Sequence, residues 1–533
     1  MTVLHLAAQF SSAEVVKSLL EAGADIRAED SEKQSPLQLA AMRKDSSDVI
    51  KVLVVGGADV KVLDRQQRST LHLVAKNNSC RGDLIKTLVE GGADINACDS
   101  NQQTPLHLAL VGNSSADMVS ALVDFGADVD LWDKDKQTPL HLAAKHSDDV
   151  DVLKLLIESS ANGGMLQTLF ELAVSHNTSV DVVRMLMQEC EIDLSALGKD
   201  KLQTFLNSAA KHNTNAEVIG MLIKSGADVN ARNEDEMTPL EVAAKYNTSV
   251  VVVDMLRGCS ADDEDCQMQE KLMDLAAEHN PSADVMEMLL GCSANAKDGQ
   301  KVKELLELAA KYNPSADVMK MLIKSSGNVE PDRLQALLLS AAEHNASADV
   351  VQVLIDNGAD VKVEDEKHRT PLHIAAQHNS SAGVIRALVG AGANLEARCT
   401  FDGDFYNNCR SYSNWCTPLH IAALYSKSRD VIRELVKAGA DVDALDVIQM
   451  TPVHLAAAKN QCAVEMLIEN GANVNLLNKY SASPLFTAAR CFNNWAVIAL
   501  CEAGADPNLG WNPHTHPEVH HKMQSLIRQQ LSL

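Results

Sequence analysis

Aromatic residues are scarce in this chain: they make up 3% of its 533 residues, whereas 46% of the residues are hydrophobic. The core must therefore be built from Ala, Leu, Val, Ile and Met, a composition typical of helical proteins. Cysteine is too dilute for a disulfide scaffold, because there are only 12 cysteines and none forms a CxxC pair. We expect a helical protein whose cysteines are mostly reduced and buried.

Basic residues are also few compared with acidic residues. Lys and Arg number 47 against 72 Asp and Glu, which gives a formal net charge of -25. Without a basic field the chain is poorly suited to a phosphate backbone, so we expect no nucleic acid among its general partners. The acidic field instead favours basic segments of partner proteins and disfavours an anionic membrane surface.

Long apolar runs, targeting signals and catalytic motifs are missing as well. No apolar stretch reaches the roughly 18 residues of a membrane span, and Met1 leads into Thr-Val-Leu-His without a signal-peptide pattern. This predicts a soluble protein without membrane insertion, in the cytoplasm, with the nucleus as the alternative. The chain also has no GxxxxGK(S/T), GxGxxG, HExxH or GxSxG motif. We therefore predict that it is not an enzyme and has no catalytic residue, cofactor or metal ligand.

What the chain does contain is a repeated pattern. From Thr370 it reads Thr-Pro-Leu-His-Ile-Ala-Ala, and related strings recur at intervals that are mostly about 32 to 36 residues. Fifteen copies begin at Thr2, Ser35, Ser69, Thr104, Thr138, Thr168, Thr204, Thr238, Lys271, Glu304, Ala336, Thr370, Thr417, Thr451 and Ser483.

Each copy predicts two helices. Thr-Pro opens the first helix, because the hydroxyl caps free amides and proline fits the first turn. Leu372 and Ile374 give this helix an apolar face, and Val384, Ile385 and Leu388 have the spacing of a second buried helical face. Neither helix can bury its apolar face alone, so consecutive copies must stack.

An asparagine recurs between the two helices, often followed by a capping serine such as Ser282 or Ser315. We expect these asparagines to adopt the left-handed conformation, to which Asn is suited. They are Asn78, Asn113, Asn177, Asn213, Asn247, Asn280, Asn313, Asn345, Asn379 and Asn460. Asn177, Asn247, Asn345 and Asn379 match the Asn-x-Ser glycosylation pattern, but a turn followed by a cap explains them better.

The pattern resembles the ankyrin repeat, whose signature is Thr-Pro-Leu-His-x-Ala at a period of about 33 residues; the resemblance covers residues 2–511. It implies an all-α-type repeat fold, an ankyrin solenoid of helix-turn-helix units with short β-turn fingers near Gly-Ala-Asp. It also implies that the motif histidine is structural and bonds the turns together. These histidines are His5, His72, His107, His141, His373, His420 and His454.

The pattern weakens in the middle of the chain, where the Gly-Ala-Asp finger degrades. We divide the chain into copies 1–5 at 1–167, divergent copies 6–10 at 168–335, and copies 11–15 at 336–511. We expect the central block to have altered fingers and lower local stability. The proline of the motif is replaced there by Leu169, Phe205, Leu272, Leu305 and Leu337.

The two ends of the repeat array differ. Residues 512–533 place apolar side chains on one helical face and are expected to form a capping helix or tail. The first helix has no such lid, so we expect either an N-terminal partner or a longer parent chain. His514, His516, His520 and His521 have spacings that suit a divalent metal, which stays an open alternative.

An insertion at 400–416, between the twelfth and thirteenth copies, carries five of the chain's 18 aromatic residues. Rigid rings beside arginine make interaction hot spots, so we expect a partner contact; the alternative is a loop packed on itself. The candidate residues are Phe401, Phe405, Tyr406, Arg410, Tyr412 and Trp415. Cys399, Cys409 and Cys416 leave a zinc or disulfide clip open, although their spacing fits no common zinc pattern.

A row of ring-bearing residues ends the first helix of nine consecutive copies. The row consists of His146, His176, His212, Tyr246, His279, Tyr312, His344, His378 and Tyr425, and lysine precedes several of them. In the ankyrin family these positions commonly face the concave groove, so the resemblance makes them candidate contact residues; the alternative is a copied turn without function. Imidazoles one copy apart should lie about 10 Å from each other, too far to share a zinc ion. A partly titratable row remains, suited to an acidic or aromatic ligand near neutral pH.

Together these features predict a non-enzymatic adaptor or scaffold. It would bind other proteins through a concave groove and the aromatic insertion, with affinity concentrated in a few aromatic and cationic anchors. The alternative is the repeat portion of a larger effector, such as a ubiquitin-ligase substrate receptor, a channel or a kinase, whose active domain lies outside this chain.

Overall fold

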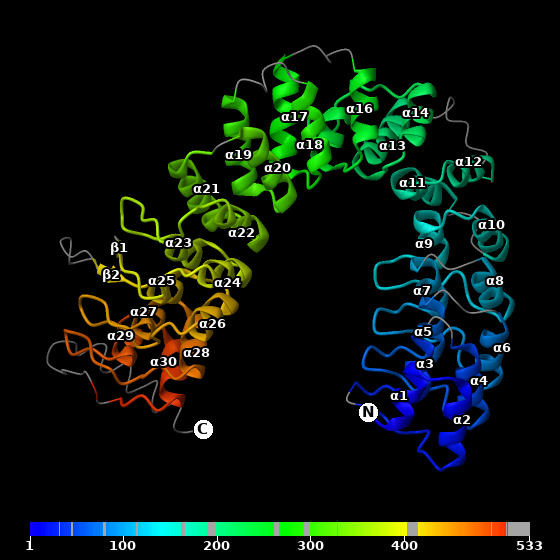
Figure 1. Cartoon of the computed structure of the whole chain (residues 1–533), viewed down its shortest axis with the longest axis horizontal. Helices are drawn as coiled ribbons and strands as arrows, with labels where there is room; N and C mark the ends of the chain where they lie inside the picture. Colours follow the sequence, from blue (N-terminus) through cyan, green and yellow to red (C-terminus); the bar gives the residue numbers. More distant parts are fainter. Residues whose placement is uncertain are drawn as a thin grey trace. The chain divides into compact units, whose positions relative to one another are not determined.

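The computed structural model describes residues 1–30, 32–43, 46–77, 82–112, 116–160, 166–189, 198–260, 266–292, 299–327, 329–401, 414–491, 493–507 and 509. Within these residues the chain forms thirty α-helices and one antiparallel sheet of two strands (Figure 1). The helices come in fifteen consecutive pairs, one pair for each copy of the pattern. The predicted helix-turn-helix repeat is therefore confirmed.

Each pair consists of an odd-numbered first helix and an even-numbered second helix. The first helices are α1 (Val3–Phe10), α3 (Pro36–Ala41), α5 (Thr70–Lys76), α7 (Pro105–Val111), α9 (Pro139–His146), α11 (Leu166–His176), α13 (Lys199–His212), α15 (Pro239–Tyr246), α17 (Cys266–His279), α19 (Gln300–Tyr312), α21 (Pro331–His344), α23 (Pro371–His378), α25 (Pro418–Tyr425), α27 (Pro452–Lys459) and α29 (Pro484–Arg490). The second helices are α2 (Ala13–Glu21), α4 (Ser47–Val55), α6 (Gly82–Glu90), α8 (Ala116–Asp124), α10 (Val150–Ser159), α12 (Val180–Glu189), α14 (Ala216–Lys224), α16 (Val250–Cys259), α18 (Ala283–Cys292), α20 (Ala316–Ser326), α22 (Ala348–Asp356), α24 (Ala382–Gly390), α26 (Arg429–Lys437), α28 (Gln461–Glu469) and α30 (Asn494–Glu502).

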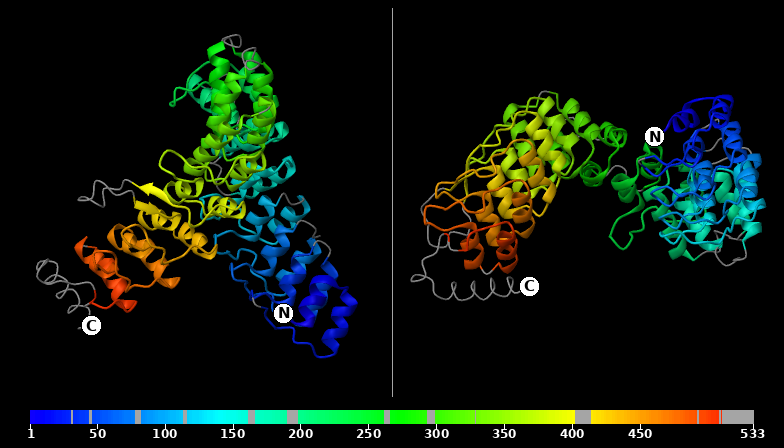
Figure 2. Two further views of the ribbon diagram at one scale, coloured as in Figure 1. Left: turned by 60° about the vertical axis from the view of Figure 1, so that its left-hand side comes forward. Right: turned by 90° about the horizontal axis from the view of Figure 1, so that it is seen from below.

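The chain divides into two units, each made of stacked pairs. The first unit is Met1–Ala243 with Val251–Ala261, and the second is Ala244–Val250 with Asp262–Leu533. Within a unit, first helices pack against first helices and second helices against second helices: α5 contacts α3 and α7, whereas α6 contacts α4 and α8. Figure 2 shows the stacked pairs from two further directions. Stacking gives each helix the apolar neighbour that a single copy lacks.

Aliphatic side chains form the core between the helices. In α9, Leu140, Ala143 and Ala144 are buried, and the small alanines let the neighbouring first helices approach closely. Large rings are rare inside: Phe170 and Phe205 meet edge to face, with ring centroids 5.4 Å apart. The composition therefore predicted the nature of the core correctly.

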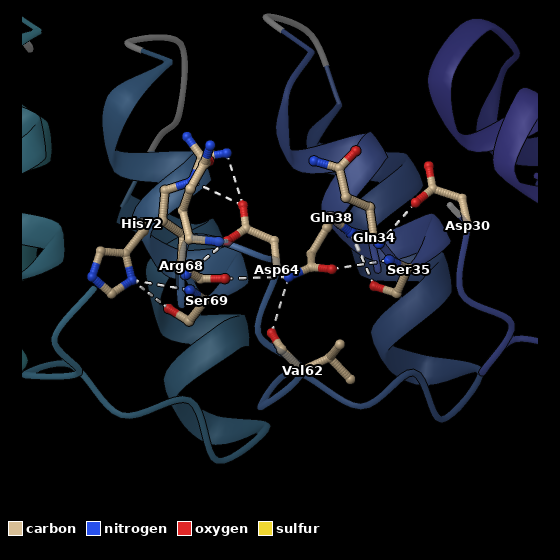
Figure 3. Close-up of polar contacts among 10 residues, drawn as sticks. Asp30, Gln34, Ser35, Gln38, Val62, Asp64, Arg68, Ser69 and His72 are labelled. Atoms are coloured by element: carbon tan, nitrogen blue, oxygen red, sulfur yellow. Dashed lines mark hydrogen bonds and ion pairs between the residues drawn. The ribbon is translucent and has the colours of Figure 1, made fainter. Parts of the chain in front are cut away.

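The motif histidine joins consecutive copies, as the resemblance implied. The Ser69 amide donates to Nδ1 of His72 at 3.1 Å, so Nε2 carries the proton and donates to the carbonyl of Gln103 in the next copy at 2.9 Å. Gln38 occupies the same place in α3 (Figure 3). Its Oε1 accepts from the Ser35 amide, and its Nε2 donates to the Val62 carbonyl at 3.0 Å.

The same link recurs near the end of the chain. His373, His420 and His454 are buried, and each bonds through Nε2 to a carbonyl of the following copy at 3.0 to 3.1 Å. Burial lowers the pKa of each of these three imidazoles to about 4, because the charged form would lose its hydration. These three histidines are therefore neutral structural groups near neutral pH.

Eight fingers between copies close with the same side-chain turn. In the finger before α5, the Asp64 carboxylate accepts from the amides of Gln66 and Arg68, both at 2.9 Å, and Gln67 between them has φ +60° (Figure 3). The acceptor side chains are those of Asp30, Asp64, Asp99, Asp133, Asn233, Asp365, Asp446 and Asn478. Three residues after each acceptor lies a left-handed residue other than glycine. The two bonds offset the steric cost of that conformation, which is about 1–2 kcal/mol.

Five copies have longer first helices. The helices α13, α17 and α21 each contain 14 residues, α19 contains 13 and α11 contains 11, whereas the other first helices contain 6 to 8. The sequence analysis placed the start of α13 at Thr204, which was wrong: the helix begins at Lys199, and the Thr204 hydroxyl donates to the Asp200 carbonyl inside it. Without the Thr-Pro pair nothing stops the helix from extending toward its N-terminus.

The long helices do not coincide with the block predicted at 168–335. The helix α15 lies in that block but is short and follows the finger turn of Asn233, whereas α21 is long and crosses the boundary at 335. The boundary at 167 falls within α11. The three-block division stays a prediction, and the expected capping helix at 512–533 lies outside the described residues.

The recurrent asparagines that the structure describes form a ladder, and for them the expectation of a left-handed turn was wrong; Asn78 and Asn113 lie outside the described residues. Asn313 has φ −81° and ψ 123°, an extended conformation. Its side-chain amide donates to the carbonyls of Ala277 at 3.0 Å and Asn280 at 2.8 Å in the preceding copy, and its Oδ1 accepts from the Ser315 amide. The extended backbone directs the amide back along the stack, so burial between copies decides the conformation. The same link is made by Asn177, Asn213, Asn280, Asn345 and Asn379.

Candidate functional site

The insertion grows out of a finger between α24 and α25. Strands β1 (Cys399–Phe401) and β2 (Asn414–Cys416) pair antiparallel, with Cys399 opposite Cys416 and Thr400 opposite Trp415. The Thr400 amide donates to the Lys367 carbonyl of the neighbouring finger at 2.9 Å, which anchors the base of the insertion. In the other fingers Asp or Asn closes the turn where Cys399 stands here.

Trp415 is the insertion candidate whose side chain the structure describes, and it is 48% exposed. Phe405, Tyr406, Arg410 and Tyr412 lie outside the described residues, as does the side chain of Phe401. The partner contact predicted for the insertion therefore rests on an exposed tryptophan at an anchored base.

The cysteines at this base are buried. Cys399 and Cys416 are both free thiols and pack with Ile421. Burial raises the pKa of Cys399 to about 12 and that of Cys416 also well above its usual range, so both remain protonated. Cys409 lies outside the described residues, and within those residues no three His, Cys, Asp or Glu side chains gather around a metal position. The zinc or disulfide clip left open for Cys399, Cys409 and Cys416 stays a prediction.

The predicted ring row follows one edge of the layer of first helices. Each of its nine members is the last residue of a first helix, from His146 at the end of α9 to Tyr425 at the end of α25. Most are exposed: Tyr246 is 43% and Tyr312 45% exposed, although the alanines one turn earlier are buried. Helix geometry therefore brings these side chains to the surface at one position of every copy.

The rings are closer together than their spacing along the chain suggested. His176 and His212 are stacked with centroids 4.9 Å apart and planes 16° apart, so the expected separation of about 10 Å was wrong for this pair. Tyr312 and His344 meet at 6.5 Å with an angle of 61°. Side chains of adjacent first helices lean toward one another, which copy spacing alone does not reveal.

Lysines add charge beside some of the rings. The ammonium of Lys245 lies 5.1 Å from the Tyr246 ring centroid, and that of Lys311 lies 4.9 Å from the centroid of Tyr312. A hydrogen bond to Tyr312 raises the pKa of Lys311. These cation–π contacts orient the tyrosine rings.

Four imidazoles in the row have a lowered pKa. Burial is the main cause that lowers the pKa of His146, His176, His212 and His279 below 6.5. Lysine charges act in the same direction on all four, whereas the Glu278 carboxylate, 3.5 Å from His279, opposes the shift there. These four imidazoles are thus mostly uncharged near neutral pH.

A second set of exposed apolar side chains escaped the sequence analysis. Trp132 is 51%, Val447 43% and Tyr480 61% exposed, and all three lie in fingers, next to or near the Asx turn residue. The position beside that Asp or Asn is the signal that could have found them. The predicted histidine cluster at 514–521 lies outside the described residues.

Comparisons with known proteins agree with this architecture. A family model described as ankyrin repeats matches residues 1–64, 71–166, 170–267, 272–365, 306–399, 338–446 and 419–510. No curated protein matches the chain. Among the described residues, no helix is long and apolar enough to span a bilayer. Ankyrin repeats are a non-catalytic fold that generally binds other proteins.

Proposed function

Because this chain belongs to the ankyrin-repeat family, we propose that it is a non-enzymatic adaptor or scaffold that binds partner proteins through the ring row. The observation that carries the proposal is that nine ring-bearing residues occupy the same helix-end position in nine consecutive copies. Rigid rings bury large areas at a small cost in side-chain entropy, which suits them as anchors of an interface.

Contacts that restrain the ring side chains in the free chain support the same proposal. Stacking of His176 on His212 and the lysine contacts of Tyr246 and Tyr312 restrain these side chains before any partner arrives. Anchors that are already restrained lose less entropy on binding, so more of the contact energy becomes affinity. We include Trp415 at the base of the insertion as a separate contact.

The hydrogen bonds of the buried motif histidines support a non-enzymatic role. Both ring nitrogens of the motif histidines are hydrogen-bonded. Nδ1 accepts from the amide of the N-cap residue, and Nε2 donates to the carbonyl directly before the next copy. This holds for His72, His107, His373, His420 and His454. A general base needs a nitrogen that can reach a substrate proton, and these nitrogens are committed.

The test is affinity capture from a cell extract with three variants of the full chain, read by mass spectrometry. One variant replaces Tyr246, Tyr312 and Tyr425 by alanine. A second replaces residues 399–416 by the five-residue turn of 446–450, which the chain itself uses one copy later. The control replaces the exposed Val55 and Val251 on second helices by alanine.

We expect the control to retain the partners of the natural chain and the first variant to lose most of them. Partners lost only from the second variant would assign their recognition to the insertion. If the tyrosine variant, folded as judged by circular dichroism, captures everything that the control captures, the row is not the recognition surface and the proposal fails.

A further inference from the structure

The part of the ring row within the first unit has a charge opposite to that of the whole chain. Lys145 and His146 end α9, His176 ends α11, and Lys211 and His212 end α13. We call these five residues the basic triplet, since they come from three consecutive copies. Farther along the row, glutamates stand beside the rings: Glu278 is 3.5 Å from His279 and Glu343 is 3.8 Å from His344.

The basic triplet is a spatial cluster and not only a sequence pattern. The helix α11 packs against α9 on one side and α13 on the other. The stacked rings of His176 and His212 join two of the copies, and the charge of Lys145 acts on His146, His176 and His212 alike. One ammonium thus influences the imidazoles of all three copies.

Two carboxylates of the neighbouring second helices are engaged elsewhere. Asp149 caps α10 by accepting from the Asp151 amide at 2.9 Å, and Asp181 in α12 pairs with Arg184 at 3.4 Å. Glu217 lies in the first turn of α14, where an acid complements the helix dipole. Within the described residues, the charges that act on the three imidazoles are those of Lys145, Lys211 and the imidazoles themselves.

We propose that Lys145, His146, His176, Lys211 and His212 form a subsite for an acidic segment of a protein partner. The subsite deepens the proposed function and rests on it. It differs from the preference for basic segments that the net charge of -25 suggests, because a partner in contact feels the local side chains more than the distant ones. Carboxylates of such a segment would accept hydrogen bonds from the lysines and from protonated imidazoles.

Proton uptake follows from this arrangement. Without a partner, burial and the lysine charges lower the pKa of His146, His176 and His212 below 6.5. A carboxylate in contact raises these pKa values again, so the complex holds more protons than the free chain. Affinity for an acidic segment therefore rises as the pH falls from neutral toward the pKa of the free imidazoles.

The probe is a fluorescently labelled peptide of ten glutamates, and its anisotropy is measured with the full chain at low ionic strength. We expect saturable binding that tightens about tenfold from about pH 7.5 to about pH 6, which corresponds to the uptake of roughly one proton. A peptide of ten glutamines should not bind. An oligonucleotide of similar charge that binds while the glutamate peptide does not would overturn the proposal.

Variants locate the binding on the triplet. Replacing Lys145 and Lys211 by glutamine should weaken the affinity about tenfold. Replacing His146, His176 and His212 by glutamine should leave the affinity near pH 7.5 within about twofold and abolish its increase at low pH. Lys76→Gln together with Lys459→Gln is the matched control and should change nothing, because these exposed lysines end the first helices α5 and α27 outside the ring row.

The inference fails if the glutamate peptide does not bind, if the lysine variant binds it as tightly as the control, or if the affinity is independent of pH. Any of these three outcomes leaves the proposed adaptor function intact, provided that the tyrosine variant still loses partners in the affinity capture. Thermal melts verify that the variants are folded, and NMR titration of the His176 and His212 ring protons reports their pKa with and without the peptide. An upward shift on binding is expected.

Discussion

Acid should unfold the copies that contain the buried histidines His373, His420 and His454. In the native chain their pKa is about 4, whereas an unfolded histidine has a pKa near 6.5. Unfolding therefore takes up a proton at each site below pH 6.5, and stability falls with pH until about pH 4, below which it changes no further for this reason. Between these two pH values each histidine lowers the free energy of unfolding by about 1.4 kcal/mol for every pH unit.

At pH 5 each of the three histidines should lower the free energy of unfolding by about 2 kcal/mol relative to neutral pH, and the three together by about 6 kcal/mol. That sum is comparable to the whole stability of an ordinary domain, about 5–15 kcal/mol. The helices α23, α25 and α27 should therefore lose protection first as the pH falls. Hydrogen exchange followed by mass spectrometry at about pH 7 and about pH 5 measures this, after correction for the intrinsic dependence of exchange on pH.

The chain itself offers the substitution that separates charge from packing. Gln38 makes the cap and the inter-copy bonds of a motif histidine without a titratable group. We expect His420→Gln to change stability by less than about 1 kcal/mol at pH 7 and to reduce the acid slope by about 1.4 kcal/mol per pH unit, as read from urea midpoints. His378→Gln at the exposed end of α23 is the control. An acid slope that is equal in the natural chain and in His420→Gln would refute the reasoning.

Three further predictions concern the links between copies. Asn313→Ala removes the donor to two buried carbonyls and should cost about 1–3 kcal/mol in urea unfolding, whereas Asn230→Ala in an exposed finger should cost less than half of that. Asp446→Ala should lose about 1–3 kcal/mol because the left-handed turn at Gln449 loses both acceptor bonds, while Asp446→Asn should stay within about 1 kcal/mol, since Asn478 closes the next finger. Amides of the block 168–335 should exchange faster than those of the flanking blocks, and uniform protection across all three blocks would contradict the lower stability expected there.

Sequence patterns predicted those parts of the fold whose signals are local. Every first helix whose motif has Thr-Pro or Ser-Pro begins at that proline, from Pro36 to Pro484, because ring geometry and the capping hydroxyl act within one turn. Thr204 has no proline after it, so the start of α13 is decided by helical residues upstream and the prediction was five residues late. The side-chain turns of the fingers were missed for a different reason. Their left-handed residues, such as Gln67 and Gln449, are not glycines and carry no signal of their own.

The candidate row was found because it sits at a fixed position of the repeat, but its geometry could not be read from spacing. His176 and His212 lie 36 residues apart in the chain and stack at 4.9 Å because their side chains lean across the interface between α11 and α13. Asn313 was assigned the wrong conformation for a related reason: the preference of Asn for left-handed turns is weak compared with two buried hydrogen bonds to another copy. Contacts between copies overruled local preference in both cases.

Two of the copies that lack the motif histidine have an ion pair in place of its link. Asp274 and Glu307 stand at the histidine position of α17 and α19, and each pairs with a cation on the next long helix: Asp274 with Lys301 at 2.7 Å, and Glu307 with Arg333 at 2.8 Å. The helices α19 and α21 provide these cations because they extend into the space that a finger occupies elsewhere. Ion pairs that are partly exposed contribute only about 1 kcal/mol or less, so the asparagine ladder becomes the main polar connection there. In α17 and α19 an acid at the histidine position thus occurs together with a long following helix, and the asparagine ladder continues through both copies.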